Sequence, residues 1–441
     1  MSESKINVII TPEKNFYLRN SMDEEIRGVV SVQAESQGGK AVRSGVDMIF
    51  LLDSSISMQN EFSINGPKKN EIAVEAAKKA AEQLGKNDTI TVISFNSGAF
   101  LMLDHEKVSA KTKINKGIEE ILEHQGSTNF EAAMDLALAV SKNRKNNHVK
   151  VVFLTDGNET AGNSQRALGL AENLVKSGAT IDAMGIGGDF NYDYMKNYSA
   201  ISGGITENLD SVRKTAEVFR NILKTGQNAV AINGFLNINF EKGIRDVKIY
   251  QYYPEKKVYG DKVSEQDKRN YIGLSVGDLP VNGAKEYALS CQADLPDETN
   301  FKLADINVSY KDPATGGMIN QDEQWLFNLT DNADNIEQNS KVGKSFEDID
   351  LLIGYEVVMK DYKNGNRDPA IKRLEQMIET AKQLGKNDEL VIYELYKEKI
   401  KRNENLTQED INLLSYTSTS KTDLVAAIKT GSKKDKLTGQ G

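Results

Sequence analysis

The feature that most constrains the fold is a run of eight residues, Val46–Asp53 (VDMIFLLD), in which apolar residues follow one another until an acid ends the run. A short apolar run without alternation is typical of a strand buried on both faces in a parallel sheet. A second such run, 149–156 (VKVVFLTD), also ends in an acid and is followed by Gly157. With helical patterns between the strands, the sequence predicts a doubly wound α/β sheet.

Oxygen-bearing side chains follow these two strands. Asp53, Ser55 and Ser57 have the spacing D-x-S-x-S, Asp156 ends the second run, and Thr128 lies on a loop, 126–129, just before an amphipathic helix. Ligands of open α/β sheets bind outside the carboxyl ends of the strands, where these residues are expected. Donors that are all oxygen suit Mg²⁺, Mn²⁺ or Ca²⁺ rather than zinc.

This set of five residues resembles the metal-ion-dependent adhesion site of von Willebrand factor A domains, and the resemblance covers about residues 45–226. In that family the serines and the threonine coordinate the ion directly or nearly so, the acids act largely through water, and one position stays open for a partner's carboxylate. The resemblance therefore implies a site for Mg²⁺ (or Mn²⁺ or Ca²⁺) made of Asp53, Ser55, Ser57, Thr128 and Asp156. Position 56 is Ile where many members have Gly, and its branched side chain is expected to stiffen or cover the loop.

Simpler interpretations of the same residues stay open. Asp53 and the serines are also typical of a turn followed by a helix cap, and Thr155-Asp156-Gly157 is an ordinary turn sequence after a strand. A complete motif is also compatible with partner binding that does not need the metal.

The rest of the chain divides by the period of its pattern. Apolar and polar residues alternate over 5–36 and again from Ala229, which predicts strands of an antiparallel sheet with one wet face, whereas 343–414 shows helical spacing. Because so few N-terminal strands cannot bury a core alone, we expect them to join the later sheet. The architecture then resembles bacterial relatives of inter-α-trypsin inhibitor heavy chains and calcium-activated chloride channel regulators. The predicted regions are 1–44 (strands of the β-domain), 45–226 (inserted von Willebrand A domain), 227–342 (β-sandwich), 343–414 (helical) and 415–441 (flexible tail).

Composition narrows the function classes. The formal charge of −9 argues against nucleic acid as the main partner. No apolar run has the length of a membrane span, and the N-terminus lacks the pattern of a signal peptide. The single cysteine, Cys291, cannot form an internal disulfide and is expected to pack as a small apolar side chain. These observations predict a cytoplasmic protein.

The leading hypothesis is a non-enzymatic, metal-dependent module that captures a Glu or Asp of a protein partner. The resemblance implies an adaptor in complex assembly, in some relatives beside an AAA+ ATPase. One rival is a metal-assisted hydrolase with Glu159 or His124 as the general base, although the chain has only three histidines. Another is a structural scaffold that binds through its C-terminal helices.

The C-terminal segment suggests a further kind of partner. It is rich in hydroxyl groups, so a phosphothreonine-binding module that reads the tail is a possible partner. The hydroxyl-bearing residues are Thr417, Ser418, Thr419, Ser420, Thr422, Ser432 and Thr438.

Overall fold

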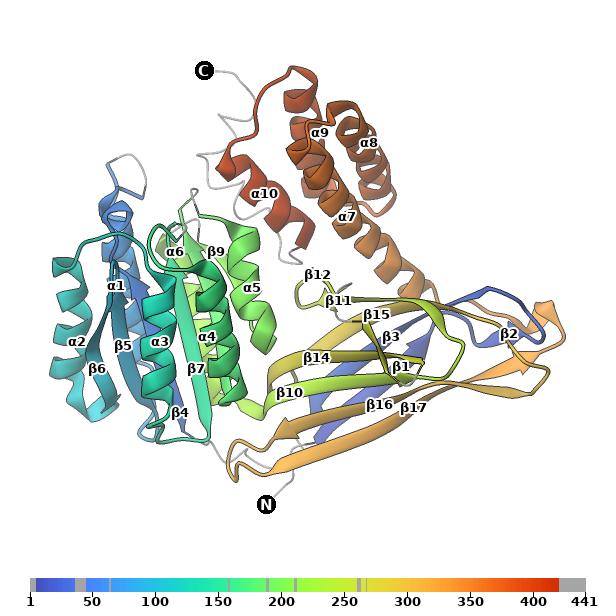
Figure 1. The fold of residues 1–441 in the computed structure, drawn as a ribbon, viewed down its shortest axis with the longest axis horizontal. Helices are drawn as coiled ribbons and strands as arrows, with labels where there is room; N and C mark the ends of the chain where they lie inside the picture. Colours follow the sequence, from blue (N-terminus) through green and yellow to red (C-terminus); the bar gives the residue numbers. More distant parts are fainter. Residues whose placement is uncertain are drawn as a thin grey trace.

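A computed structural model describes residues 5–35, 45–62, 65–157, 159–187, 190–209, 212–259, 263–266 and 268–419. An α/β domain lies beside a β-sandwich, and a group of helices rises from the sandwich and returns toward the α/β domain (Figure 1). The predicted fold class is confirmed: a doubly wound domain is inserted into an antiparallel sandwich and followed by helices.

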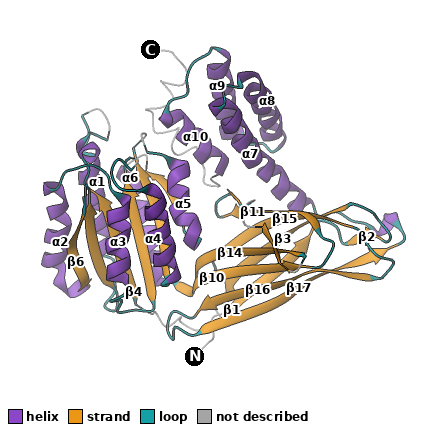
Figure 2. Cartoon of the chain, viewed as in Figure 1, coloured by secondary structure: helices purple, strands orange, loops and turns teal. Residues whose placement is uncertain are grey.

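The α/β domain has a central sheet with the order β6-β5-β4-β7-β8-β9, in which only the edge strand β6 is antiparallel to its neighbour. Every residue of β4, β5, β7 and β8 is buried, as the continuous apolar runs predict. Helices α1, α2 and α6 pack on one face of the sheet and α3, α4 and α5 on the other (Figure 2). The strands are β4 (Val46–Asp53), β5 (Thr89–Phe95), β6 (Ala99–Lys107), β7 (His148–Thr155), β8 (Ala179–Ile186) and β9 (Thr206–Leu209), and the helices are α1 (Lys69–Ala81), α2 (Lys111–Glu119), α3 (Phe130–Ser141), α4 (Ser164–Lys176), α5 (Tyr192–Ser202) and α6 (Val212–Gln227).

The sandwich consists of two sheets that share one hydrophobic core. The N-terminal strands join it as expected: β1 and β3 lie in the sheet β1-β3-β15-β11-β12, and β2 pairs with β17 at the edge of the sheet β13-β14-β10-β16-β17-β2. The chain leaves the sandwich after β3 and returns at β10, so the α/β domain is an insertion. The strands of the sandwich are β1 (Lys5–Pro12), β2 (Phe16–Leu18), β3 (Glu24–Glu35), β10 (Ala229–Phe240), β11 (Arg245–Tyr253), β12 (Lys257–Val258), β13 (Val263–Gln266), β14 (Arg269–Pro280), β15 (Ala284–Ala293), β16 (Asn300–Lys311) and β17 (Met318–Thr330).

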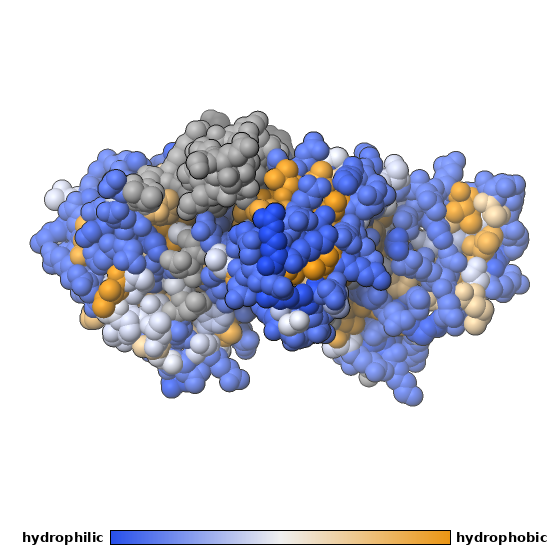
Figure 3. All heavy atoms as spheres, turned by 90° about the horizontal axis from the view of Figure 1, so that it is seen from above, coloured by the Kyte–Doolittle hydropathy of each residue, from blue (hydrophilic) through white to orange (hydrophobic). Residues whose placement is uncertain are grey.

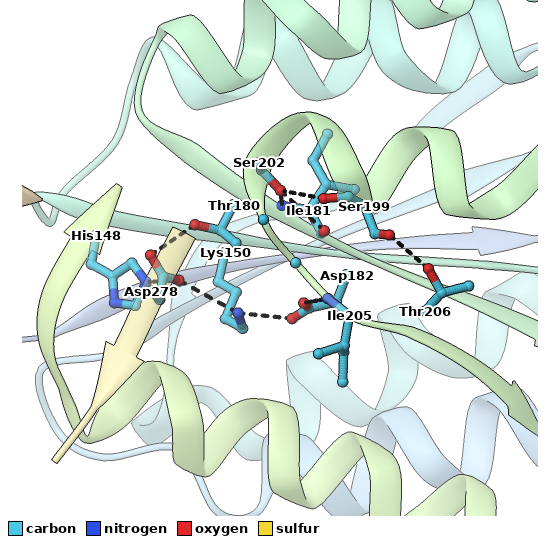
Figure 4. A network of polar contacts seen from close by, with 12 residues as sticks. His148, Lys150, Thr180, Ile181, Asp182, Ser199, Ser202, Ile205, Thr206 and Asp278 are labelled. Atoms are coloured by element: carbon cyan, nitrogen blue, oxygen red, sulfur yellow. Dashed lines mark hydrogen bonds and ion pairs between the residues drawn. The ribbon is translucent and has the colours of Figure 1, made fainter. Parts of the chain in front are cut away.

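A buried polar network joins the two domains at the amino ends of β7 and β8 (Figure 4). Asp278 of β14 reaches from the sandwich to His148 Nε2 at 2.8 Å and accepts a hydrogen bond from Thr180 at 2.8 Å. Lys150 Nζ lies 2.8 Å from Asp182 and 3.4 Å from Asp278. Because the network closes around buried charges of opposite sign, it holds the α/β domain against the sandwich at the edge of the sheet opposite to Asp53 and Asp156.

The C-terminal helices are α7 (Ser340–Lys363), α8 (Arg367–Gln383), α9 (Asn387–Lys401) and α10 (Gln408–Thr419). The first half of α7 packs on the outer face of the sandwich, where Val342 and Phe346 contact the cluster that contains Val29. The second half forms a core with the other three helices. Helix α10 reaches the α/β domain: the Asn412 side chain donates to the Phe190 carbonyl at 2.5 Å and accepts from the Tyr192 amide at 3.3 Å.

Two details differ from the sequence-based expectations. The short strand β9 at the edge of the α/β sheet was not predicted, because four residues carry too little pattern. Helix α10 extends to Thr419, beyond the expected helical limit at 414, and it buries Thr417 and Ser418 completely, so neither hydroxyl is available to a kinase in this fold. The remaining tail residues, 420–441, and residues 36–44 between β3 and β4 lie outside the described residues.

The face of the molecule seen from above is mainly polar (Figure 3). Seen from above, the molecule shows mostly hydrophilic residues with hydrophobic ones in scattered groups (Figure 3). In the part of the chain that the structure describes, no helix combines the length and apolar character of a membrane span. Cys291 is buried in the sandwich core, as predicted.

Candidate functional site

The first loop of the site follows β4 and is held against the end of β5. The Ser54 amide and hydroxyl both donate to the Phe95 carbonyl, at 2.8 and 3.0 Å. Beyond it, the 3-10 turn Ile56–Gln59 reverses the chain toward α1. Because Ser54 fixes the backbone, the neighbouring Asp53 and Ser55 side chains are held at the carboxyl edge of the sheet.

The second loop, 126–129, is bound to the first and to β5. The Ile56 amide donates to the Gly126 carbonyl at 2.9 Å, and the Asn129 amide donates to the Asn96 carbonyl at 2.8 Å. Thr128 is buried, and its amide donates to the Thr160 hydroxyl at 2.9 Å. The Asn129 side chain then caps α3 by accepting from the Ala132 amide. Three segments distant in sequence thus meet at one edge.

Four of the five predicted residues form one hydrogen-bonded series. The Ser55 amide donates to Asp53 Oδ1 at 2.7 Å, the Ser55 and Ser57 hydroxyl oxygens lie 3.1 Å apart, and the Ser57 hydroxyl donates to Asp156 Oδ1 at 2.7 Å. The structure places Thr128 on the adjoining loop, linked to this series through the bond between the Ile56 amide and the Gly126 carbonyl. Two carboxylates and two hydroxyls therefore share a single small region.

The environment of Asp53 disfavours its negative charge. Its carboxyl is buried, and it accepts hydrogen bonds from the Ser55 amide and from the Thr155 hydroxyl, the latter at 2.5 Å. Burial, with a smaller contribution from the nearby charge of Asp156, raises the pKa of Asp53 to about 7, although the hydrogen bonds from Thr155 and Ser55 act in the opposite direction. A positive charge beside Asp53 would reverse the effect of burial.

The sequence analysis did not predict that a lysine ammonium lies at this site. Lys69, the first residue of α1, is only 4% exposed, and its ammonium donates to Asp156 Oδ2 at 2.8 Å. The lysine follows the motif at no fixed spacing and stands in the polar stretch Lys68-Lys69-Asn70-Glu71, so no local signal separates it from surface lysines. Only the placement of α1 behind the loop brings it to Asp156.

The donor chemistry fits a hard divalent cation. The converging side chains offer carboxylate and hydroxyl oxygens, which Mg²⁺, Mn²⁺ and Ca²⁺ prefer. No cluster of three or more His, Cys, Asp or Glu side chains suited to a metal occurs among the described residues, so this fit depends on the serine and threonine hydroxyls. The raised pKa of the buried Asp53 also favours a cation site, because a cation beside this carboxyl would stabilise its charged form.

Ile56 does not cover the loop, which was one expectation for this position. Its side chain is 63% exposed, and its backbone enters the 3-10 turn with an ordinary negative φ. The branched side chain therefore points to solvent and does not cover the loop, although Ser55 itself is buried.

The two candidate general bases of the hydrolase hypothesis, Glu159 and His124, make contacts that stabilise the fold. Glu159 accepts from the Glu131 amide in the first turn of α3 at 3.3 Å. The His124 ring packs on Phe100 with 4.9 Å between the ring centroids. Neither contact directs a proton acceptor toward Asp53 or Asp156.

Comparisons with known proteins identify the family of the α/β domain. Residues 48–159 match the family model of the von Willebrand factor type A domain. An uncharacterized protein of the cyanobacterium Synechocystis is 23% identical over 282 residues, which are 62% of this chain and 63% of that protein. Human inter-alpha-trypsin inhibitor heavy chain H2 is 25% identical over 241 residues, 52% of this chain but only 23% of the heavy chain. The match thus leaves more than a third of the first relative and most of the second without a counterpart here.

A solved structure resembles the whole chain. The von Willebrand factor type A protein from Catenulispora acidiphila superposes with a TM-score of 0.78 at 16% identity, covering 96% of this chain and 98% of that one. At this identity the likeness concerns the fold, and it extends through the sandwich and the C-terminal helices. The doubly wound sheet and the family match lead to one conclusion: residues 48–159 belong to the von Willebrand factor type A domain family.

Proposed function

We propose that this protein is a non-enzymatic interaction module that binds a divalent cation at the carboxyl edge of the α/β sheet and captures an acidic side chain of a protein partner. Von Willebrand factor A domains are in general protein-interaction modules, and this supports the class of function. The proposed ligands are Asp53, Ser55, Ser57, Thr128 and Asp156. The observation that carries the proposal is the meeting of two buried carboxylates with two hydroxyls at 2.7–3.1 Å on loops that are otherwise fixed by backbone bonds.

Each residue has a defined task in this proposal. Ser55 and Ser57 present hydroxyl oxygens, and the Ser57 hydroxyl orients Asp156 through its 2.7 Å bond. Thr155 and the Ser55 amide hold the Asp53 carboxyl in one orientation. When bound, the cation would supply a positive centre that attracts a partner's carboxylate. Because the loops are already fixed, little ordering is needed on binding.

In the described part of the chain, the sandwich does not cover this edge, and α10 contacts it only after β8, at Phe190 and Tyr192. The sandwich is attached at the opposite edge of the sheet, through Asp278 and Lys150. The apolar faces of the C-terminal helices pack against one another, and residues such as Leu352, Leu374 and Tyr393 are buried. This favours the metal edge over the helices as the binding surface, in contrast to the scaffold hypothesis.

The test uses the full chain with Asp53→Ala. Metal affinity is measured by isothermal titration with Mg²⁺, Mn²⁺ and Ca²⁺, and partner capture by pull-down from native lysate with and without chelator. We expect the variant and the chelator to abolish both metal binding and capture. Capture that continues in chelator would reject the metal-bridged mechanism. Removal of the C-terminal helices by truncation after residue 342 is less suitable as a test of the scaffold hypothesis, because it would expose the apolar sheet face around Val29.

Two finer parts of the proposal rest on resemblance and composition. We propose that the protein acts as a cytoplasmic adaptor in complex assembly, with which its single, buried cysteine is compatible. Identification of the proteins retained in the pull-down tests the adaptor role. A phosphatase and esterase panel with Mg²⁺ or Mn²⁺ tests the hydrolase alternative, for which we expect no turnover.

A further inference from the structure

The ammonium of Lys69 occupies an unusual place. It lies at the first position of α1, where the helix dipole is positive and acidic residues are favoured, and its side chain is only 6% exposed. Local preference and desolvation both disfavour a buried lysine there. What offsets them is its 2.8 Å contact with Asp156, whose side chain is fully buried. A buried lysine at a position that disfavours it points to a functional reason.

The end of β8 provides the room for this side chain. Gly187 has φ +90°, and a Cβ at this position would lie 3.0 Å from Lys69 Cε and 3.2 Å from Nζ. Any other residue would therefore press on the lysine while adopting a strained backbone. The lysine is thus enclosed between the Asp156 loop and the loop after β8.

The charge count at the site depends on this residue. Asp53 and Asp156 contribute two negative charges when both are ionised, and the Lys69 ammonium contributes one positive charge, so the set carries one net negative charge. A divalent cation on this set leaves one net positive charge, whereas without the lysine the sum would be zero. Excess positive charge weakens retention of the cation and strengthens attraction for an incoming carboxylate.

We propose that Lys69 is a specificity-determining residue that lowers the affinity of the site for divalent cations and raises the affinity of the loaded site for carboxylates. This inference rests on the proposed function. Lys69 acts through Asp156, to which its ammonium donates, and is itself a positioning residue rather than a ligand.

The test compares Lys69→Met and Lys69→Gln with the wild-type full chain. Mn²⁺ affinity is measured by electron paramagnetic resonance of the free ion, and acetate binding by the loss of water proton relaxation enhancement in the Mn²⁺-loaded protein. We expect both variants to bind Mn²⁺ roughly tenfold more tightly and acetate roughly tenfold more weakly. Glutamine keeps a donor toward Asp156 without the charge, so it serves if the methionine variant does not fold.

Lys68→Met is the matched control. Lys68 is the adjacent lysine, but it is exposed and its ammonium contacts Gln59 at 3.3 Å, so its removal should leave both affinities within about twofold of wild type. If the wild type binds no Mn²⁺, the proposed function fails and the inference with it. If the wild type binds Mn²⁺ but the Lys69 variants do not bind it more tightly, or do not lose acetate affinity, the inference is overturned while the proposed function stands.

Discussion

Replacement of Asp53 by Asn should stabilise the metal-free protein at alkaline pH, the opposite of what removal of a buried hydrogen-bonded acid usually does. The reason is the raised pKa of this carboxyl, from an ordinary value of 3.8 to about 7, caused first by burial. Asparagine fills the same space, its oxygen can accept from the Ser55 amide, and its nitrogen can donate to the Thr155 hydroxyl, which now contacts the second carboxylate oxygen.

The sign and size follow from proton linkage. Between about pH 4 and pH 7 the folded Asp53 keeps its proton, whereas in the unfolded chain it has lost it, so the free energy of unfolding falls as pH rises through this window. The pKa difference corresponds to a loss of about 4 kcal/mol once the pH is well above 7. The asparagine side chain cannot ionise, so the Asp53→Asn variant avoids this loss.

The measurement is urea unfolding of the full chain in EDTA, followed by circular dichroism, at pH 4 and pH 8. The variant should match the wild type at pH 4 and exceed it by up to ~4 kcal/mol at pH 8. Added Mg²⁺ should raise the stability of the wild type alone, which reverses the order of the two proteins.

Asp156→Asn provides the contrast. It removes the carboxylate that the buried Lys69 ammonium contacts, so the metal-free protein should lose roughly 3 kcal/mol at pH 8. If Asp53→Asn is no more stable than wild type at pH 8 in EDTA, or if both variants shift stability in the same direction, the electrostatic account of the site is wrong.

Three further predictions concern the site, the domain junction and the sandwich core. Ser57→Ala should weaken Mn²⁺ binding about 10- to 100-fold by titration, because a proposed ligand and the bond that orients Asp156 are both lost; unchanged affinity would remove Ser57 from the proposed ligand set. Asp278→Ala should lower stability by about 3–5 kcal/mol at pH 7, since it leaves the buried Lys150 with one carboxylate fewer. Burial alone would raise the pKa of Asp278, but the imidazole of His148 and the ammonium of Lys150 hold it well below its usual range. The contribution of Asp278 to folding stability is therefore complete above about pH 4 and is lost as the pH falls below that value. The difference between thermal unfolding at pH 7 and at pH 3 should be larger for the wild type than for the Asp278→Ala variant. Gly28→Ala should destabilise by about 1–3 kcal/mol in urea unfolding, because a Cβ there would lie 2.4 Å from the Trp325 ring, and a neutral result would mean that the two sheets can separate locally.

The fold class followed from patterns that depend on neighbouring residues alone. Eight-residue apolar runs allow little but buried parallel strands, and the predicted Val46–Asp53 run coincides with β4. The period of two around the insertion predicted that the N-terminal strands join the later sheet, because too few strands cannot bury a core. The candidate oxygen donors were also visible, since their positions after strands determine the edge at which they lie.

The tertiary structure decided the features that depend on which distant surfaces meet. Thr417 and Ser418, polar in sequence, are buried because α10 packs against the other helices and the α/β domain. Asp278 and Lys150 are ordinary surface residues by type, yet they form the buried junction between two domains. Lys69 is one of many lysines until α1 places its ammonium on Asp156. The apolar and polar pattern of a segment indicates which face of that helix or strand is buried. The burial and electrostatic environment of a single side chain depend instead on the residues that the folded chain places beside it.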